Sequence, residues 1–363
     1  MFDRAAARAH EQGSIKPIEP AMLESKSVGW LPIMRIATRL TDRLKLQHPI
    51  ISAPMAFASG GELAGVVSAA GGLGLIGGGY GDSDWLARQF DRSSNRPVGC
   101  GFITWSLARN PRLLDQALER SPSAIFLSFG NPEPFASSVR AAAVPLICQV
   151  QSLDDARRAL DVGADIVVAQ GAEAGGHGEK RATFTFVPEV ADLVRRQAPD
   201  TIVCAAGGIA DGRGLAAALM LGADGVVMGS RFWASSEALV HPNLHQVALA
   251  ATGDDTIRTS VMDIARRLDW PSRFSLRVRK NAFTEAWHGN EAHLLADIDA
   301  QSVAYRDAWA RGDPAIAAIM IGEVAGLIHN IEPASDILLR TVSEAIALLQ
   351  GASSHLFTVT TSN

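Results

Sequence analysis

Short apolar segments alternate with amphipathic segments along most of this 363-residue chain. Eight segments are apolar on both faces and bounded by glycine or proline, which is typical of buried strands. They span residues 49–54, 73–77, 98–104, 124–128, 145–150, 166–170, 202–206 and 225–228. Helical periodicity occupies residues 62–70, 84–91, 112–119, 153–162, 188–196 and 214–221 between them. We therefore predict a parallel sheet whose faces are covered by helices.

The number and spacing of these segments favour a (β/α)8 barrel, the TIM barrel of the α/β class. Eight strands within roughly 200 residues suit a single barrel. The similar phrases Val-Gly-Ala-Asp at 162–165 and Leu-Gly-Ala-Asp at 221–224 each end a helical segment with glycine and enter a strand, as loops between helices and strands do. A doubly wound open sheet is the alternative, because the number of strands does not prove closure.

The remaining parts of the chain have other patterns. Residues 1–33 lack sustained periodicity, so we expect an N-terminal extension, with Met34 as the functional start and residues 34–230 as the barrel core. Residues 231–350 contain few strand signals, and we interpret them as the last barrel helix and a helical cap. The helical patterns lie at 243–251, 261–268, 280–287, 291–310, 315–328 and 334–349. Residues 351–363 are polar and predict a loose tail.

Composition narrows the function classes. The chain is 47% hydrophobic, with a net charge of −5 and an isoelectric point near 6.0, which disfavours nucleic acid and anionic membranes as partners. No apolar run approaches the roughly 20 residues that span a bilayer, and we expect a cytoplasmic protein. Cys100, Cys148 and Cys204 all fall in predicted strands, where reduced core residues are expected.

Two strand ends predict a phosphate site. Ala-Ala-Gly-Gly-Ile-Ala-Asp-Gly at 205–212 and Gly-Val-Val-Met-Gly-Ser at 225–230 are the ends of the last two predicted strands, each followed by a helical pattern. Glycines at such ends let backbone N–H groups approach a ligand closely. In barrels of this type, phosphate groups are frequently bound after strands seven and eight. These two ends are therefore candidates for holding one phosphate.

The segment at 169–178, Ala-Gln-Gly-Ala-Glu-Ala-Gly-Gly-His-Gly, follows the sixth predicted strand and contains the candidate chemical residue, His177. Loops at this edge of a barrel build the active site. A neutral imidazole can take a proton from an acidic C–H group or support an anion. Gln170, at the strand end, could hydrogen-bond the edge of a heterocycle.

Two other motifs are weaker candidates. Residues 72–77 match the G-x-G-x-x-G pattern, but a helix precedes the glycines and a strand lies within them, which argues against a dinucleotide site. His241 and His245 are four residues apart without the glutamate of a zinc motif, so we expect no metal site.

Taken together, several motifs resemble those of nitronate monooxygenases, formerly called 2-nitropropane dioxygenases. They are Pro-Ile-Ile-Ser-Ala-Pro-Met-Ala at 49–56, Ala-Ala-Gly-Gly-Leu-Gly at 69–74, the segment ending in His177, and Ala-Gly-Gly-Ile-Ala-Asp-Gly at 206–212. The resemblance extends over residues 38–349. FMN-dependent enoyl-thioester reductases and NAD(P)H:quinone reductases look similar.

The resemblance implies a TIM barrel that binds FMN without a covalent link. Ala53, Pro54 and Met55 would lie behind the isoalloxazine ring, and Gln170 would meet its polar edge. Gly175 and Gly176 would pass close to the cofactor. Its phosphate would be bound by Gly207, Gly208, Gly229 and Ser230. His177 matches the residue that acts as the catalytic base in this family.

The chain also departs from the family pattern. Many relatives have an asparagine near the flavin on the third strand, where this chain has Gly101. With only two tyrosines, Tyr80 and Tyr305, it does not reproduce the tyrosine-lined pocket of the best-studied nitronate oxidisers. We expect apolar walls for the substrate pocket, with Phe102, Trp105 and Phe129 as candidates.

Three functions remain open. The first is oxidation of alkyl nitronates or nitroalkanes by FMN and O₂, which yields a carbonyl compound and nitrite. The second is an FMN-dependent NAD(P)H reductase of enoyl thioesters or quinones. The third is a phosphate-binding barrel without flavin, acting as an isomerase or a sensor. The expected partner is a small-molecule substrate, and a homodimer is a possible assembly.

Overall fold

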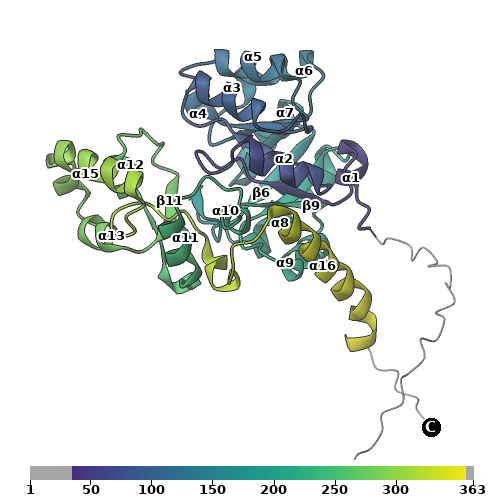
Figure 1. Ribbon diagram of the computed structural model, residues 1–363. Coiled ribbons are helices and arrows are strands. Elements are labelled where there is room, and N and C mark those ends of the chain that lie inside the picture. The colour runs from purple at the N-terminus through teal and green to yellow at the C-terminus, as the bar shows by residue number, and fades with distance from the viewer. Residues whose placement is uncertain (1–34, 357–363) are drawn as a thin grey trace, which may run out of the picture. The chain divides into compact units, whose positions relative to one another are not determined.

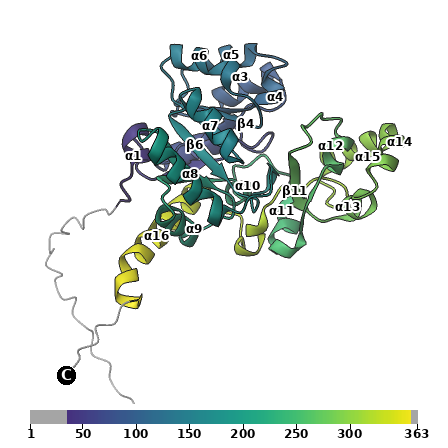
Figure 2. The same ribbon diagram turned by 180° about the vertical axis from the view of Figure 1, so that it is seen from behind.

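The structure, a computed structural model, describes residues 35–356 and contains eight parallel strands in one closed sheet (Figures 1 and 2). The strands are β1 (Ile50–Ser52), β2 (Leu75–Gly77), β3 (Gly99–Ile103), β4 (Ile125–Ser128), β5 (Leu146–Val150), β6 (Ile166–Gln170), β8 (Ile202–Ala206) and β9 (Gly225–Met228). They pair in the order β1-β9-β8-β6-β5-β4-β3-β2. A parallel bridge between Ile51 and Leu73 closes the sheet. The predicted TIM barrel is confirmed, and the open sheet is excluded.

Helices cover the outer face of this sheet. Along the chain they are α2 (Gly61–Ala69), α3 (Ser83–Asp91), α5 (Arg112–Glu119), α6 (Glu133–Ala141), α7 (Leu153–Asp161), α8 (Thr183–Gln197), α9 (Gly212–Met220) and α16 (Ala334–Leu356), with short helices α1 (Arg39–Leu44), α4 (Thr104–Leu107) and α10 (Ser230–Trp233) at strand ends. The final helix, α16, packs against α9 and α2. Helix α6 was not predicted; Pro134 in its first turn is compatible with a helix, but two serines obscure the apolar pattern.

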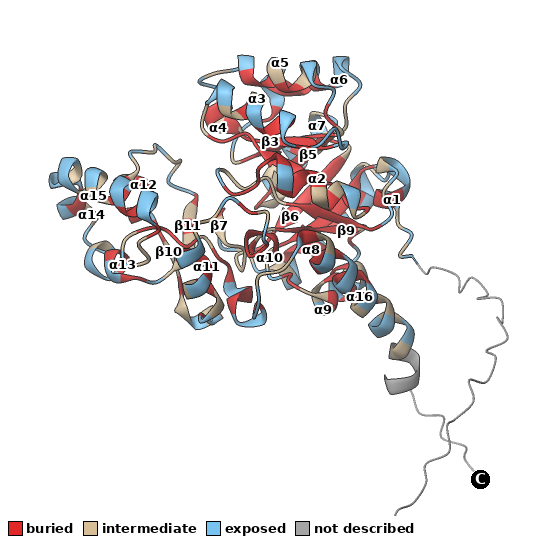
Figure 3. Ribbon diagram, in the orientation of Figure 1, coloured by how far each residue is buried: buried red, intermediate tan, exposed pale blue. Residues whose placement is uncertain are grey.

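The barrel strands are buried (Figure 3), and their apolar side chains form an inner and an outer layer, as expected for strands covered on both faces. Alternate strand residues such as Phe126, Val168 and Val227 fill the interior, and their neighbours along the strands pack against the helices. The three cysteines are buried and unpaired. Burial raises the pKa of the Cys148 thiol to about 12, so these side chains serve packing and not chemistry.

The glycines at 72–77 allow a helix to approach the sheet. A Cβ atom at Gly74 would lie 1.8 Å from the carbonyl oxygen of Ala64 in α2. At Gly72 it would lie 2.7 Å from the carbonyl oxygen of Ile50. The motif therefore serves packing of α2 on the barrel, in agreement with the interpretation that it is not a dinucleotide loop.

The cap is less helical than predicted. Strands β10 (Thr256–Thr259) and β11 (Ser275–Arg279) form an antiparallel sheet with β7 (Gly176–Gly178), which comes from the loop after β6. The prediction missed the period-two pattern Ser-Leu-Arg-Val-Arg of β11, whose leucine and valine are buried. They join a separate apolar core with Met262, Phe283 and Tyr305.

The helical segments of the cap also differ from the prediction. Helix α11 (Pro242–Leu249), α12 (Val261–Ala265) and α13 (Ala282–Trp287) lie where helices were expected. The expected helix at 291–310 is divided into α14 (Glu291–Ala296) and α15 (Ile298–Arg311). The helix expected at 315–328 is wrong: this range contains only the 3-10 turn η2 (Glu323–Leu327), which contacts a second 3-10 turn, η1 (Gly253–Asp255). Glycines at 322 and 326 disfavour a longer helix.

The described residues stop short of both ends of the chain. The expected extension at 1–33 and the start at Met34 lie outside the described residues, as do residues 357–363. Helix α16 continues to Leu356, past residue 351 where a loose tail was expected. Within residues 35–356, no helix has both the length and the apolarity that crossing a bilayer requires.

Candidate active site

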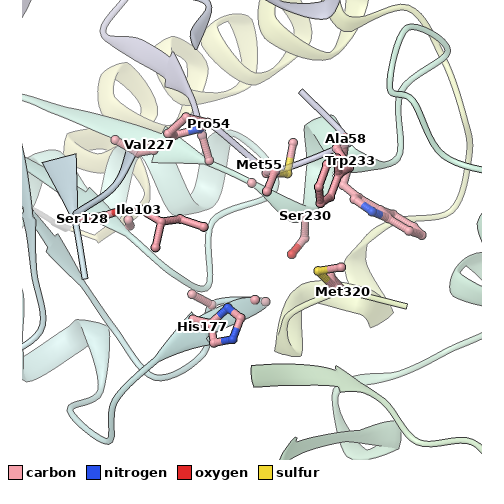
Figure 4. Close-up of a pocket in the computed structure, with 18 of the residues that line it drawn as sticks. Pro54, Met55, Ala58, Ile103, Ser128, His177, Val227, Ser230, Trp233 and Met320 are labelled. Carbon is pink, nitrogen blue, oxygen red and sulfur yellow. The ribbon is translucent and has the colours of Figure 1, made fainter. Parts of the chain in front are cut away.

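A cavity of about 240 Å³ lies at the carboxyl ends of the barrel strands, between the barrel and the cap. Figure 4 shows Pro54 and Met55 on one side and His177 on the other. The sequence-predicted residues that line it are Ala53, Pro54, Met55, Phe102, Phe129, Gln170, Gly175, Gly176, His177, Gly207, Gly208, Gly229 and Ser230. The fold therefore brings together candidate residues from six separate segments of the chain, as the barrel prediction requires.

Two predicted residues, Gly101 and Trp105, do not line the cavity. A Cβ atom at Gly101 would lie 2.3 Å from Cγ of Pro54, so this glycine makes room for Pro54 instead of contacting a ligand. Trp105 lies behind the wall and packs edge-on against Trp270, with ring centroids 5.3 Å apart. The roles of Gly101 as a cofactor contact and of Trp105 as a pocket residue therefore stay predictions, which the lining of this cavity does not support.

The loops after β8 and β9 present backbone amides to the cavity. Gly207 and Gly208 have φ values of +93° and +75°, which side chains rarely adopt. Within the described chain, the amides of Gly207, Gly208 and Gly229 donate no hydrogen bond. The Ser230 hydroxyl accepts a hydrogen bond from the amide of Gly322 at 2.9 Å and keeps its own proton to donate. This donor set fits a phosphate group.

Gln170 is part of a polar network at the end of β6. Its Oε1 accepts hydrogen bonds from Nε2 of Gln149 (3.1 Å) and Nε2 of Gln151 (2.8 Å). Its Nε2 donates to the backbone carbonyl of His177 at 3.1 Å and has a second N–H group. Gln149 also lines the cavity, although the sequence analysis did not select it.

His177 lies in β7, paired with Leu276 of β11. Its Nε2 is 2.9 Å from Oδ2 of Asp263, a buried carboxylate in α12. The imidazole stacks on Trp270 with ring centroids 3.3 Å apart and 9° between planes, while Phe129 contacts it edge-on. His177 is thus held in one orientation by a charge on its edge and an aromatic ring on its face.

The ionisation of His177 suits a base. Burial lowers its pKa, and this outweighs the opposing effect of the Asp263 carboxylate. The ring is therefore neutral at pH 7. Because a carboxylate only accepts, Nε2 carries the hydrogen and Nδ1 the lone pair. Nδ1 has no hydrogen-bond partner among residues 35–356 and is not fully buried, so a ligand in the cavity can reach it.

Three functional candidates were missed by sequence reasoning: Asp263, Arg266 and Trp270, all from the cap. Asp263 lies within the otherwise apolar helix Val-Met-Asp-Ile-Ala. A charge in such a helix needs a partner if it is buried, and that conflict was the available signal. Arg266 and Trp270 both line the cavity, but neither residue belongs to a recognisable sequence motif.

The loop that carries His177 is fixed by ionic contacts. Arg258 in β10 and Arg277 in β11 both donate to the carbonyl oxygen of Ala172, at 2.9 and 3.1 Å. Arg277 also pairs with Glu323 of η2 at 2.8 Å. Burial and the neighbouring Arg277 lower the pKa of Arg258 to about 10, so Arg258 remains charged at pH 7. The cap therefore holds the barrel loop from outside the cavity.

The fold and the cavity define a TIM barrel enzyme whose site is shared between barrel loops and a cap. Residues 37–99 and 104–344 match the model of the nitronate monooxygenase family. The chain is 35% identical to nitronate monooxygenase npaC of Metarhizium robertsii over 341 residues, which covers 85% of this chain and 93% of that protein. It is 32% identical to a nitronate monooxygenase of Neurospora crassa, with 82% and 88% covered.

A solved structure gives the same result for the fold. FabK from Thermotoga maritima superposes with a TM-score of 0.78 and 32% identity, covering 88% of this chain and all of that one. The protein belongs to the nitronate monooxygenase family and is an oxidoreductase. The resemblance inferred from the motifs is confirmed.

Proposed function

We propose that the protein binds FMN in this cavity and oxidises alkyl nitronates and nitroalkanes with O₂, yielding a carbonyl compound and nitrite. Family membership supports this chemistry. The observation that carries the proposal is the arrangement of the site: a neutral imidazole with a free Nδ1 shares one cavity with an unpaired set of backbone amides.

The residues of the cavity fit FMN. The free amides of Gly207, Gly208 and Gly229, with the Ser230 hydroxyl, would bind its phosphate. Ala53, Pro54 and Met55 would back the flavin ring, and the remaining N–H of Gln170 would meet its polar edge. Gly175 and Gly176 would pass beside it without side chains. FMN would supply the electron-accepting chemistry that no side chain in the cavity can perform.

The side chains around His177 would prepare the substrate. Nδ1 of His177 would take the proton from the carbon next to the nitro group, forming the nitronate. Asp263 would stabilise the imidazolium that results, since its carboxylate already accepts from Nε2. Phe102 and Phe129 would supply apolar walls that keep water from this carbon.

The test is anaerobic mixing of the FMN-loaded protein with an alkyl nitronate and, separately, with NADPH, followed by flavin absorbance. We expect the nitronate to reduce the flavin quickly and NADPH to reduce it slowly. Admitting O₂ should then release nitrite, measured colorimetrically. Wild-type protein without nitronate is the control.

Two results would overturn the proposal. Rapid reduction of the flavin by NADPH alone, with no reaction of nitronate, would favour the reductase of enoyl thioesters or quinones. Protein that is colourless as purified and binds no added FMN would favour a phosphate-binding barrel without flavin.

A further inference from the structure

Arg266 is a cation in the wall of the cavity with capacity for another partner. It follows α12 and contributes to the lining of the cavity, and only 13% of its side chain is exposed. Its single ion pair with the described residues 35–356, from Nη1 to Oδ1 of Asp263, is long at 3.5 Å. Its guanidinium carbon lies 5.4 Å from the ring centroid of Tyr80, another residue of the lining. The Tyr80 side chain also interacts with this guanidinium as a hydrogen-bond partner. A guanidinium has five N–H donors, so these two partners leave donors for a ligand.

Asp263 places this cation beside the base. Its Oδ2 accepts from Nε2 of His177 at 2.9 Å, and its Oδ1 faces Arg266. The charge of Arg266 also reaches the imidazole, because it lowers the pKa of His177. One carboxylate therefore joins a neutral base and a permanent cation in the same wall.

The charges in this wall are balanced before and after proton transfer. With a neutral nitroalkane bound, Arg266 and Asp263 compensate each other and His177 is neutral. Transfer of the proton to Nδ1 creates an imidazolium and a nitronate anion. Asp263 then faces the imidazolium, and the nitronate needs a cation. Arg266 is the available one, and a planar guanidinium matches a planar pair of oxygens.

We propose that Arg266 binds the oxygens of the substrate's nitro or nitronate group and makes this part of the cavity a subsite for a planar oxyanion. This inference rests on the proposed function for the identity of the substrate. The subsite itself rests only on the position of Arg266. Tyr80 and Trp270 form aromatic walls beside it, with ring centroids 6.4 Å apart.

The test uses nitrate, a planar oxyanion that cannot be oxidised in this reaction. Its binding to the FMN-loaded protein is measured by calorimetry in wild type, Arg266→Met, Arg266→Lys and Arg109→Met. Methionine keeps an apolar stem against Tyr80 but removes the charge. Arg109 is the matched control: its guanidinium also lies over a tryptophan, Trp105, but its side chain is 61% exposed and outside the cavity lining.

We expect Arg266→Met to weaken nitrate binding by about 10-fold to 100-fold, the effect of one charge-assisted contact. Arg266→Lys should weaken nitrate binding less than Arg266→Met does, and Arg109→Met should bind nitrate with the wild-type affinity. In turnover, Arg266→Met should raise KM for the nitronate more than it lowers kcat. Equal nitrate affinity in wild type and Arg266→Met, or equal losses in Arg266→Met and Arg109→Met, would overturn the subsite.

The two proposals fail separately. A protein that binds nitrate through Arg266 but releases no nitrite from nitronates would contradict the proposed function and leave the subsite standing. A protein that oxidises nitronates with the same KM after Arg266→Met would contradict the subsite alone. Thermal unfolding of each variant checks that the substitution leaves the fold intact.

Discussion

The barrel loops after β8 and β9 line the cavity with glycines and Ser230, whereas the cap lines it with Arg266, Trp270 and Trp309 and holds His177 of the loop after β6 through Asp263. On the barrel side, Gly207 and Gly208 have positive φ values, and their exposed amides suit a phosphate group such as that of the proposed FMN. On the cap side, Asp263, Arg266 and Trp270 surround one base. If the proposed function holds, the phosphate of the cofactor is bound by barrel loops, whereas the residues that set the base and face the reacting group come mainly from the cap.

The largest effect is expected from removing the base. His177→Asn should lower kcat/KM for a neutral nitroalkane by about 10²- to 10⁴-fold, the usual contribution of general base catalysis. A pre-formed nitronate should lose far less, because its proton is already gone. Nitrite release measures both, and FMN content should stay unchanged. Equal losses on the two substrates would contradict a base role for His177.

A smaller effect is expected from the residue that positions the base. Asp263→Asn should lower kcat/KM for the neutral nitroalkane by about 10-fold to 100-fold. Asp263 raises the pKa of His177 against the effect of burial, so its loss should move the acid limb of the pH profile to lower pH. Asp269→Asn, an exposed carboxylate paired with Arg109, is the control. An unmoved acid limb would reduce Asp263 to a packing role.

The barrel side is tested by Gly208→Asp against Gly208→Asn. Both residues tolerate positive φ better than most, so the pair isolates the charge. We expect the aspartate to weaken FMN binding by about tenfold relative to asparagine, since it would repel the phosphate. Fluorescence titration of the flavin-free protein gives both dissociation constants. Similar values would place the phosphate elsewhere.

The smallest effect is expected at Trp105. This ring lies outside the cavity, and its Nε1 has no hydrogen-bond partner in the described part of the chain. Trp105→Phe should change KM for the nitronate by less than about twofold. The same substitution at Trp270, which stacks on His177, should raise KM more. The reverse order would restore Trp105 as a pocket residue.

The barrel and its loops were predictable because their signals are local. Glycine runs such as 205–212 end apolar strands, and their order along the chain gives the order of the strands around the barrel. His177 was found for the same reason, since a strand end in this fold is a functional position. The packing of Gly101 against Pro54 could not be predicted, because a resemblance gives the position of a residue but not the neighbour that fills its space.

The residues that the cap places around His177, namely Asp263, Arg266 and Trp270, were not predictable from local signals. Asp263 and His177 are 86 residues apart in sequence, and their contact depends on the pairing of β7 with β11. That pairing was itself missed, because the sequence Gly-His-Gly of β7 does not look like a strand. Arg266 and Trp270 follow α12 and line the same cavity, and neither belongs to a pattern that a single sequence can display.

The pairing of His177 with Leu276 limits how the cap can change over evolution. Side chains alternate between the two faces of a strand. Deleting one residue within Ser275–Arg279 would therefore shift the register by one residue, and the leucine and arginine side chains would exchange faces. The imidazole would then lose its fixed relation to α12. We expect length variation among relatives to collect in the connections between cap helices and to spare this five-residue strand.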